Sequence, residues 1–175
     1  CIGIPTETVY GLAANAYSSA ATAKIYKLKK RPKINPLIVH YYDLKMLKND
    51  CKINKYFLKL YKKYSPGPIS YILNIKKNSL ISKNVTNKKN TVAVRFPSHP
   101  IARRILKKIK YPLAAPSANI STKISPVSQK DVQDEFGKKI SLILDGGPSK
   151  IGVESTIINL INKPQILRLG GIPKE

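Results

Sequence analysis

Cysteine, histidine and tryptophan are scarce or absent in this chain of 175 residues. It holds two cysteines (Cys1 and Cys51), two histidines and no tryptophan. Two cysteines exclude a disulfide framework, and with two histidines they do not supply the ligands of a structural zinc site, so we expect no protein-held metal. No stretch approaches the roughly 18 consecutive apolar residues of a transmembrane helix. The cysteine usage predicts a reducing, cytoplasmic compartment. The lack of a long apolar run predicts no membrane partner.

Acidic residues are also scarce, at 9 Asp and Glu against 32 Lys and Arg, which gives a net charge of +23. Such an excess can indicate a nucleic-acid-binding protein. However, 27 of the basic residues are lysines, and abundant Lys, Asn and Ile together are the bias of an AT-rich genome. Lysines also alternate with apolar residues over 52–63, as expected of a solvated helix face. Compositional drift is therefore favoured over a nucleic-acid surface, and the five arginines are the informative cations.

Strand and helix patterns alternate along the chain, which has 42% hydrophobic residues and 13 prolines. We expect strands over 2–6, 36–41, 69–75, 91–96, 113–115, 142–144, 156–160 and 166–169. We expect helices over 19–30, 43–49, 53–64, 100–109 and 128–136, the first and last opened by serine caps. Residues 74–90 are expected to form an exposed loop or irregular hairpin. This order predicts an α/β fold with one mixed or largely parallel sheet covered by helices.

A dense polar segment, Pro-Thr-Glu-Thr-Val-Tyr-Gly-Leu over 5–12, follows the first expected strand. A strand that ends in Thr-Glu-Thr can place hydroxyls at the rim of a pocket, and a nearby glycine lets the backbone approach a ligand closely. The alternative is a strand followed by an ordinary polar turn. The segment alone does not decide between the two.

Three cationic side chains are candidates for binding anions. Lys29 and Arg31 close the first expected helix, where they can either neutralise phosphates in a cleft or complement the helix dipole. Arg95 interrupts an apolar strand, and a buried arginine needs an anionic partner, which a ligand can supply in a chain with so few carboxylates. His40 ends another apolar strand, where packing is the commoner alternative to ligand binding.

Familiar nucleotide and hydrolase motifs are absent from the sequence. It contains no G-x-x-x-x-G-K-[ST], G-x-G-x-x-G, H-E-x-x-H or G-x-S-x-G. Small residues and hydrogen-bonding side chains instead gather over 114–121, where they can leave room for a ligand or form a turn. A nucleotide enzyme built on this chain must therefore hold phosphates without a P-loop.

Seven motifs occur in the order and spacing of the threonylcarbamoyl-AMP synthases, a family with the YrdC-like fold, which the chain therefore resembles. They are PTETVYGL at 5–12, K-x-R-P at 29–32, NPLIVH at 35–40, Val94-Arg95, PSAN at 116–119, Ser125-Pro126 and EST at 154–156. The resemblance covers essentially the whole chain. It implies a twisted mixed parallel and antiparallel sheet with flanking helices around a basic cavity. It also implies one catalytic domain over 1–175, lacking the helix and the start of the strand that open the family's domain.

The resemblance implies an activity as well. Family members form threonylcarbamoyl-AMP and pyrophosphate from L-threonine, bicarbonate or CO₂, and ATP with Mg²⁺ bound through its phosphates. The product feeds the threonylcarbamoyladenosine modification of tRNA by a downstream transfer machinery. Carried over by position, the residues implied to bind L-threonine are Thr8, His40, Arg95, Ser117 and Ser155. Those implied to bind ATP are Lys29, Arg31, Asn35, Thr91, Asn119 and Arg168, of which Lys29 and Arg31 are the implied catalytic residues.

Two alternatives share the expected fold. A double-stranded RNA or tRNA-binding module without catalysis could use the same basic concavity for phosphates, but it would not need Thr8, His40 and Asn119 at their spacings. A carbamoyl-transfer domain of hydrogenase-maturation proteins would be accompanied by zinc-finger and acylphosphatase-like regions, which this sequence does not contain. One departure from the family is Val127, which stands where a threonine often follows Ser-Pro.

Overall fold

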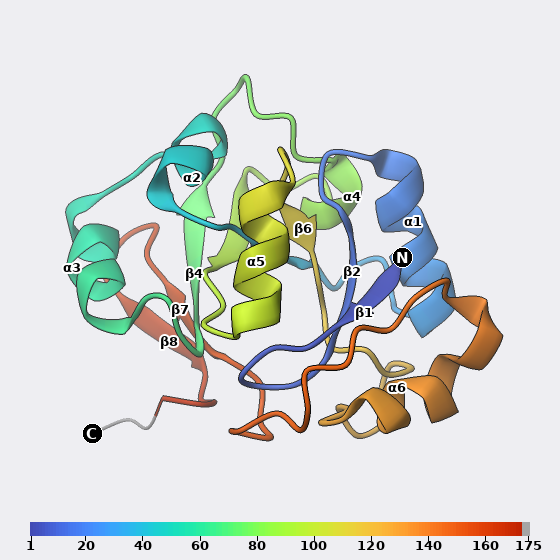
Figure 1. The fold of residues 1–175 in the computed structure, drawn as a ribbon. Helices are drawn as coiled ribbons and strands as arrows, with labels where there is room; N and C mark the ends of the chain where they lie inside the picture. Colours follow the sequence, from blue (N-terminus) through green and yellow to red (C-terminus); the bar gives the residue numbers. More distant parts are fainter. Residues whose placement is uncertain (173–175) are drawn as a thin grey trace.

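One mixed sheet of eight strands forms the centre of the structure, in the order β1-β2-β6-β3-β5-β4-β7-β8 (Figure 1). This computed structural model describes residues 1–172. The strands are β1 (Ile2–Ile4), β2 (Gly11–Asn15), β3 (Ile38–His40), β4 (Ile69–Asn74), β5 (Thr91–Arg95), β6 (Leu113–Ala114), β7 (Thr156–Asn159) and β8 (Gln165–Arg168). β3 pairs with β5, and β4 with β7, in parallel, whereas the other neighbours are antiparallel. The expected mixed α/β sheet is confirmed.

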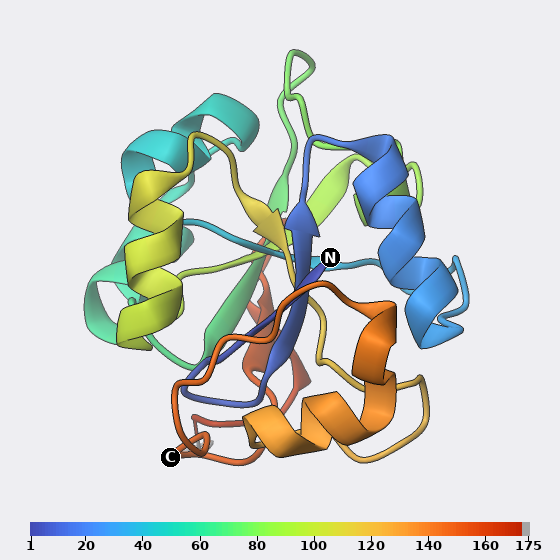
Figure 2. The same ribbon diagram turned by 45° about the vertical axis from the view of Figure 1, so that its right-hand side comes forward.

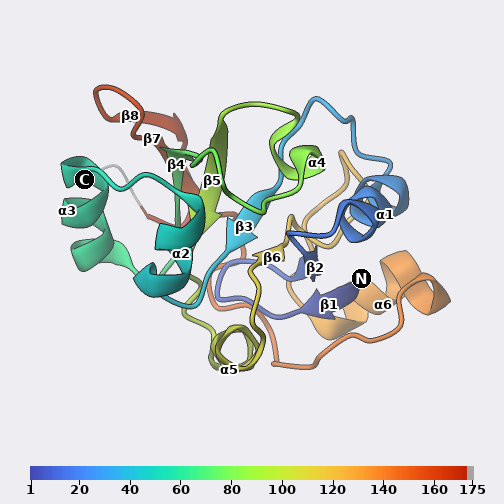
Figure 3. The ribbon, with the colours of Figure 1, turned by 90° about the horizontal axis from the view of Figure 1, so that it is seen from above.

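Helices cover both faces of this sheet. α2 (Leu44–Asp50), α3 (Lys55–Tyr64) and α5 (Pro100–Lys108) lie on one side, and α1 (Ser19–Lys29), α4 (Lys83–Thr86) and α6 (Gln129–Phe136) lie on the other (Figure 2, Figure 3). Side chains cap their first turns, and the expected capping box of Ser128 and Asp131 is confirmed at α6. Within residues 1–172, no helix has both the length and the apolar character to cross a membrane.

The structure differs from the expected order of elements in three places. The segment 142–144 was expected to be a strand, but it forms only one parallel bridge, between Gly3 and Ile143. Conversely, no strand was expected over 11–15, yet β2 pairs there with both β1 and β6. The expected loop over 74–90 contains the short helix α4, whose first turn is capped by Ser82.

An aromatic cluster supports the ends of β3 and β5. Tyr41 and Phe96 each follow the last residue of one of these strands, and their ring centroids are 6.2 Å apart. Phe57 and Tyr61 of α3 pack against Phe96, with a 4.8 Å edge contact from Tyr61. Close packing of this kind leaves little room for adjustment, so the residues that end the two strands are held firmly.

The candidate site lies where these strands end. His40 ends β3 and Arg95 ends β5, and the two residues are register partners across the parallel pair. Ser70 of β4 is the register partner of Arg95 on its other side. Its hydroxyl lies 2.8 Å from that of Ser155, which directly precedes β7. Residues far apart in the sequence therefore meet at one edge of the sheet.

Candidate functional site

A small polar cavity of about 90 Å³ lies at the ends of β3 and β5. Four of the five residues implied to bind L-threonine line it, namely His40, Arg95, Ser117 and Ser155. Two of the residues implied to bind ATP, Arg31 and Arg168, line it as well. Its single carboxylate among the described residues is Glu154, which the sequence analysis did not assign a role. The cavity therefore presents three guanidinium groups and one carboxylate.

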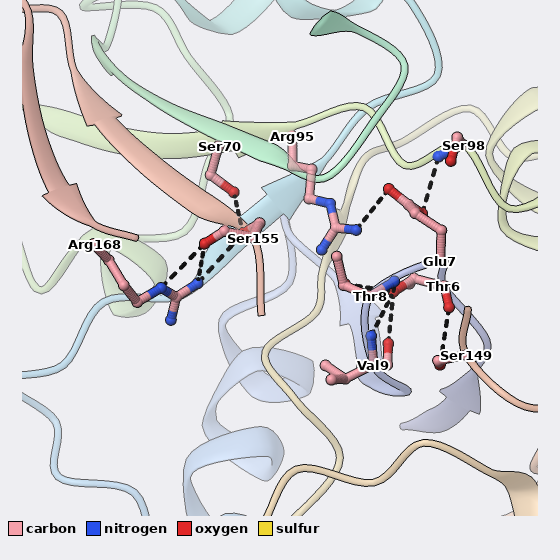
Figure 4. A network of polar contacts seen from close by, with 10 residues as sticks. All are labelled: Thr6, Glu7, Thr8, Val9, Ser70, Arg95, Ser98, Ser149, Ser155 and Arg168. Atoms are coloured by element: carbon pink, nitrogen blue, oxygen red, sulfur yellow. Dashed lines mark hydrogen bonds and ion pairs between the residues drawn. The ribbon is translucent and has the colours of Figure 1, made fainter. Parts of the chain in front are cut away.

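Arg95 has a protein partner, contrary to the expectation that a ligand supplies its anion. Its Nη2 donates to Oε1 of Glu7 over 2.8 Å, and both side chains are at least nine-tenths buried. The second carboxylate oxygen of Glu7 accepts from the backbone N–H of Ser98 (Figure 4). The Nε of Arg95 is buried without a hydrogen-bond partner within residues 1–172. Glu7 thus neutralises Arg95 and fixes its orientation, and the buried Nε is left without a protein partner.

Thr6 is the threonine of the Thr-Glu-Thr segment that lines the cavity, whereas Thr8 was the threonine expected to bind L-threonine. Thr6 lines the cavity, and Thr8 is completely buried. The Thr6 hydroxyl donates to the carbonyl of Val9 over 2.6 Å, so the Thr8 hydroxyl, 2.9 Å away, is the donor to Thr6 (Figure 4). Thr8 therefore orients Thr6 from behind. The sequence pattern could not distinguish the two threonines, because the chain turns between them after β1.

His40 is a buried, neutral imidazole in this site. Burial, and then the nearby Arg95 cation, hold the pKa of His40 well below its usual value of 6.5. Its Nδ1 is buried and has no hydrogen-bond partner among the described residues. A neutral imidazole carries one donor and one acceptor, so His40 can match a hydroxyl group in either sense.

The lowered pKa of His40 predicts a loss of stability in mild acid. As the pH falls below about 6.5, the unfolded chain binds a proton at His40 that the folded chain does not, which costs up to about 1.4 kcal/mol per pH unit. The stability is fully present above pH 6.5 and declines toward the lower pKa of the folded state. Urea denaturation between pH 7.5 and 5.5 measures the slope, and His40→Gln should make it shallower. Equal slopes for the two proteins would contradict the buried neutral state.

A second, larger cavity of about 400 Å³ adjoins the first on the face of the sheet. Four residues implied to bind ATP line it, namely Arg31, Asn35, Thr91 and Arg168. Its apolar lining comes from the sheet, through Ile72, Ala93, Ile157 and Leu167. Arg31 and Arg168 border both cavities, so the two form one cleft with a small polar end and a larger, partly apolar end.

Two arginines stand between the ends of this cleft. Arg31 donates from Nε to the carbonyl of Asn35 and from Nη2 to that of Pro36, at 3.0 and 2.9 Å. Arg168 donates from Nε and Nη2 to the carbonyl of Ser155 (Figure 4). Its Nη1 donates to the carboxylate of Glu154. Burial is the main cause of a lowered pKa for both guanidinium groups. A partly dehydrated cation held in one orientation attracts an anion more strongly than a solvated one.

Lys29 does not line either cavity, which differs from the expectation that it faces phosphates. Its side chain is 1% exposed, and Nζ donates to the backbone carbonyls of Ser117, over 2.6 Å, and of Asn119. Burial, and then the charge of Arg31, lower its pKa to about 8. In the structure, the hydrogen bonds of Lys29 hold the 117–119 segment against the end of α1.

Asn119, the last residue implied to bind ATP, is also set back from this cleft. Its amide donates to the carbonyls of Ile120 and Lys123, and it lines a separate cavity of about 710 Å³ together with Ser125 and Val127. Within residues 1–172, no group of three or more His, Cys, Asp or Glu side chains could hold a metal ion.

The chain is similar to proteins of known family. The family model Sua5_yciO_yrdC, described as "Telomere recombination", matches residues 1–170. The threonylcarbamoyl-AMP synthase of Pyrococcus abyssi is 44% identical over 176 residues, which cover 99% of this chain and 51% of that protein. The threonylcarbamoyl-AMP synthase of Bacillus subtilis is also 44% identical, with 99% and 51% covered. The chain thus spans about half the length of these curated relatives.

Solved structures show the same similarity. The crystal structure of P. abyssi Sua5 complexed with L-threonine superposes with a TM-score of 0.94 at 43% identity, covering 98% of this chain and 51% of that one. The crystal structure of E. coli YciO gives a TM-score of 0.85 at 24% identity, covering 97% and 82%. At that identity, the YciO structure supports the fold alone.

Proposed function

The chain belongs to the Sua5/YciO/YrdC family, and we propose that it is the catalytic domain of an L-threonylcarbamoyladenylate synthase. In the proposed reaction, L-threonine, bicarbonate or CO₂, and ATP give threonylcarbamoyl-AMP and pyrophosphate. The product would pass to the machinery that transfers the threonylcarbamoyl group to tRNA. The cytoplasm, which the cysteine usage predicts, is the proposed compartment.

The two-part cleft is the observation that carries this proposal. Eight of the eleven residues implied by the resemblance line it, from segments between 31 and 168. The small polar end, lined by His40 and Arg95, suits the hydroxyl and carboxylate of an amino acid. The larger end offers an apolar sheet surface for a base and ribose. Arg31 and Arg168 between the two ends would hold the triphosphate.

The proposed chemistry needs neutralised charge and alignment more than a protein nucleophile. The deprotonated threonine amine attacks CO₂ and loses one proton to water, which gives a carbamate. A carbamate oxygen then attacks the α-phosphorus of ATP as the bond to pyrophosphate breaks. The carboxylate, the carbamate and the triphosphate are anionic, so Arg31 and Arg168 would supply positive charge and hold these groups in line. Mg²⁺ bound through the phosphates would neutralise further charge, since the described residues offer no carboxylate cluster for it.

Substrate dependence tests the proposal. Pyrophosphate release from ATP should require L-threonine and bicarbonate together, and mass spectrometry should detect threonylcarbamoyl-AMP. Each omission of one substrate should reduce release to the level without protein. ATP turnover that is indifferent to L-threonine would refute the assignment. Tight, salt-resistant binding of one tRNA without any turnover would favour the RNA-binding module instead.

A further inference from the structure

Glu154 lies among the cations of the cleft. It is the single carboxylate lining the polar cavity within the described residues, and it pairs directly with Arg168. Its charge also raises the pKa values of Arg31 and Lys29 against the lowering effect of burial. The pair is about one-third exposed on each side, so solvent can reach it. Glu154 therefore occupies Nη1 of Arg168, an N–H group that could otherwise bind an anion.

We infer that Glu154 is an internal counter-ion, which the phosphates of ATP displace from Arg168 and which returns to Arg168 as pyrophosphate leaves. The inference rests on the proposed function, because it concerns the phosphate end of the same cleft. Without a counter-ion, guanidinium groups that bind a triphosphate would also retain the pyrophosphate product. A carboxylate that competes for the same arginine weakens the binding of both ATP and pyrophosphate. Its main effect on turnover is to speed the release of pyrophosphate.

The surroundings of Glu154 allow its side chain to move while its backbone stays in place. The backbone carbonyl of Glu154 accepts from the N–H of Gly171 over 2.9 Å. Gly170 packs so closely that a Cβ there would lie 2.1 Å from that carbonyl oxygen. The hydroxyl of Ser125 donates to Oε1 of Glu154 over 3.3 Å. This contact gives the carboxylate a neutral partner when Arg168 pairs with a phosphate instead. The exchange thus needs only a rotation of the Glu154 side chain.

Arg168 keeps its position when Glu154 leaves. Its Nε and Nη2 donate to the carbonyl of Ser155 over 3.1 and 2.8 Å, and only Nη1 is committed to Glu154. The guanidinium is therefore oriented by backbone contacts and can exchange one partner without losing its place. A partly exposed ion pair is worth little in net free energy, so a polyanion can compete with it.

Calorimetric binding of inorganic pyrophosphate to wild type and to Glu154→Gln tests this inference. The glutamine keeps the shape of the side chain but no longer competes with an anion for Arg168. We expect Glu154→Gln to bind pyrophosphate about two- to fivefold more tightly at low salt, the range expected for one partly exposed ion pair. In steady-state turnover, inhibition by added pyrophosphate should strengthen to the same extent. Glu154→Ala repeats the measurement if the glutamine variant does not fold.

Glu135→Gln is the matched control, because it removes one negative charge from a residue that pairs with Lys123 outside the cleft. Its affinity for pyrophosphate should change by less than about twofold. An unchanged affinity of Glu154→Gln for pyrophosphate would overturn the inference. An equal gain in affinity in Glu135→Gln would also overturn it. So would a failure of wild type and both variants to bind pyrophosphate. Weaker binding that recovers with more Mg²⁺ would instead make Glu154 a ligand of the nucleotide's metal. If wild type shows no threonine-dependent turnover but the affinities change as expected, the proposed function fails and the exchange stands.

Discussion

Replacing Arg31 with alanine should lower the rate of threonylcarbamoyl-AMP formation by about 10²–10³, the usual effect of removing one oriented electrostatic contact from a transition state. Arg31 borders both ends of the cleft, and its guanidinium is held by the carbonyls of Asn35 and Pro36. In the proposed reaction, it would therefore lie beside the phosphates, where negative charge develops as the carbamate attacks the α-phosphorus. Steady-state kinetics with saturating L-threonine and bicarbonate measure the effect.

Arg104→Ala is the control for this variant, because Arg104 is an exposed arginine on α5. It should retain the rate of wild type. The alternative reading of Arg31, as a cation that complements the dipole of α1, predicts a stability loss of only about 0.3–1 kcal/mol with intact turnover. A folded Arg31→Ala protein with normal activity would support that reading and remove Arg31 from the proposed mechanism. Thermal unfolding of both variants separates a loss of fold from a loss of chemistry.

Most of the sheet and helices could be predicted because their signals are local. The alternating pattern of β5 and the apolar run of β4 indicate strands, and a capping box marks the start of α6 within four residues. β2 has no such signal, because its small residues gain their stability from neighbours on both sides of the sheet. The segment over 142–144 has a strand-like composition, but only one of its residues meets β1 in register.

The members of the site could be predicted only in part, because their partners are distant in the sequence. The position of Arg95 on an apolar strand indicated a buried cation, yet its partner Glu7 lies 88 residues away. Nothing local to Glu7 distinguishes it from a turn residue. Glu154 was visible only as part of a motif, and its place beside Arg168 depends on the pairing of β7 with β8. Sequence spacing can identify candidate residues, but which of them meet is decided by the register of the strands.

Lys29 is the residue whose expected place changed most. The sequence pattern around it, Lys-x-Arg-Pro, suggests that both cations face one cleft. In the structure, Arg31 reaches the cleft after the chain leaves α1 through the left-handed backbone of Lys30. Lys29 still belongs to the last turn of the helix and points into the protein, toward the 117–119 segment. The end of the helix therefore separates the two cations.

Replacing Lys29 with methionine should lower stability by about 2–4 kcal/mol, because two buried carbonyls lose their donor. It should also lower kcat/KM for both L-threonine and ATP by about 10²-fold, since the loosened segment carries Ser117 at the polar end of the cleft. Loss of an ammonium that contacted only the phosphates would raise the KM for ATP and leave the KM for L-threonine unchanged. The comparison of KM for the two substrates therefore distinguishes positioning from direct phosphate binding. Urea denaturation and steady-state kinetics on the same preparation give both quantities.

Lys27→Met is the matched control, because Lys27 lies on the same helix one half-turn earlier with its side chain in solvent. It removes the same charge and adds the same side chain, and it should change stability by less than about 0.5 kcal/mol. A Lys29→Met protein that keeps the stability of wild type would show that the carbonyls of Ser117 and Asn119 do not depend on this ammonium. If that protein were stable and failed only in ATP binding, Lys29 would have to leave the segment and reach the phosphates during turnover. Because the ammonium is 1% exposed and holds two carbonyls at once, we expect the combined loss of stability and of both substrate affinities.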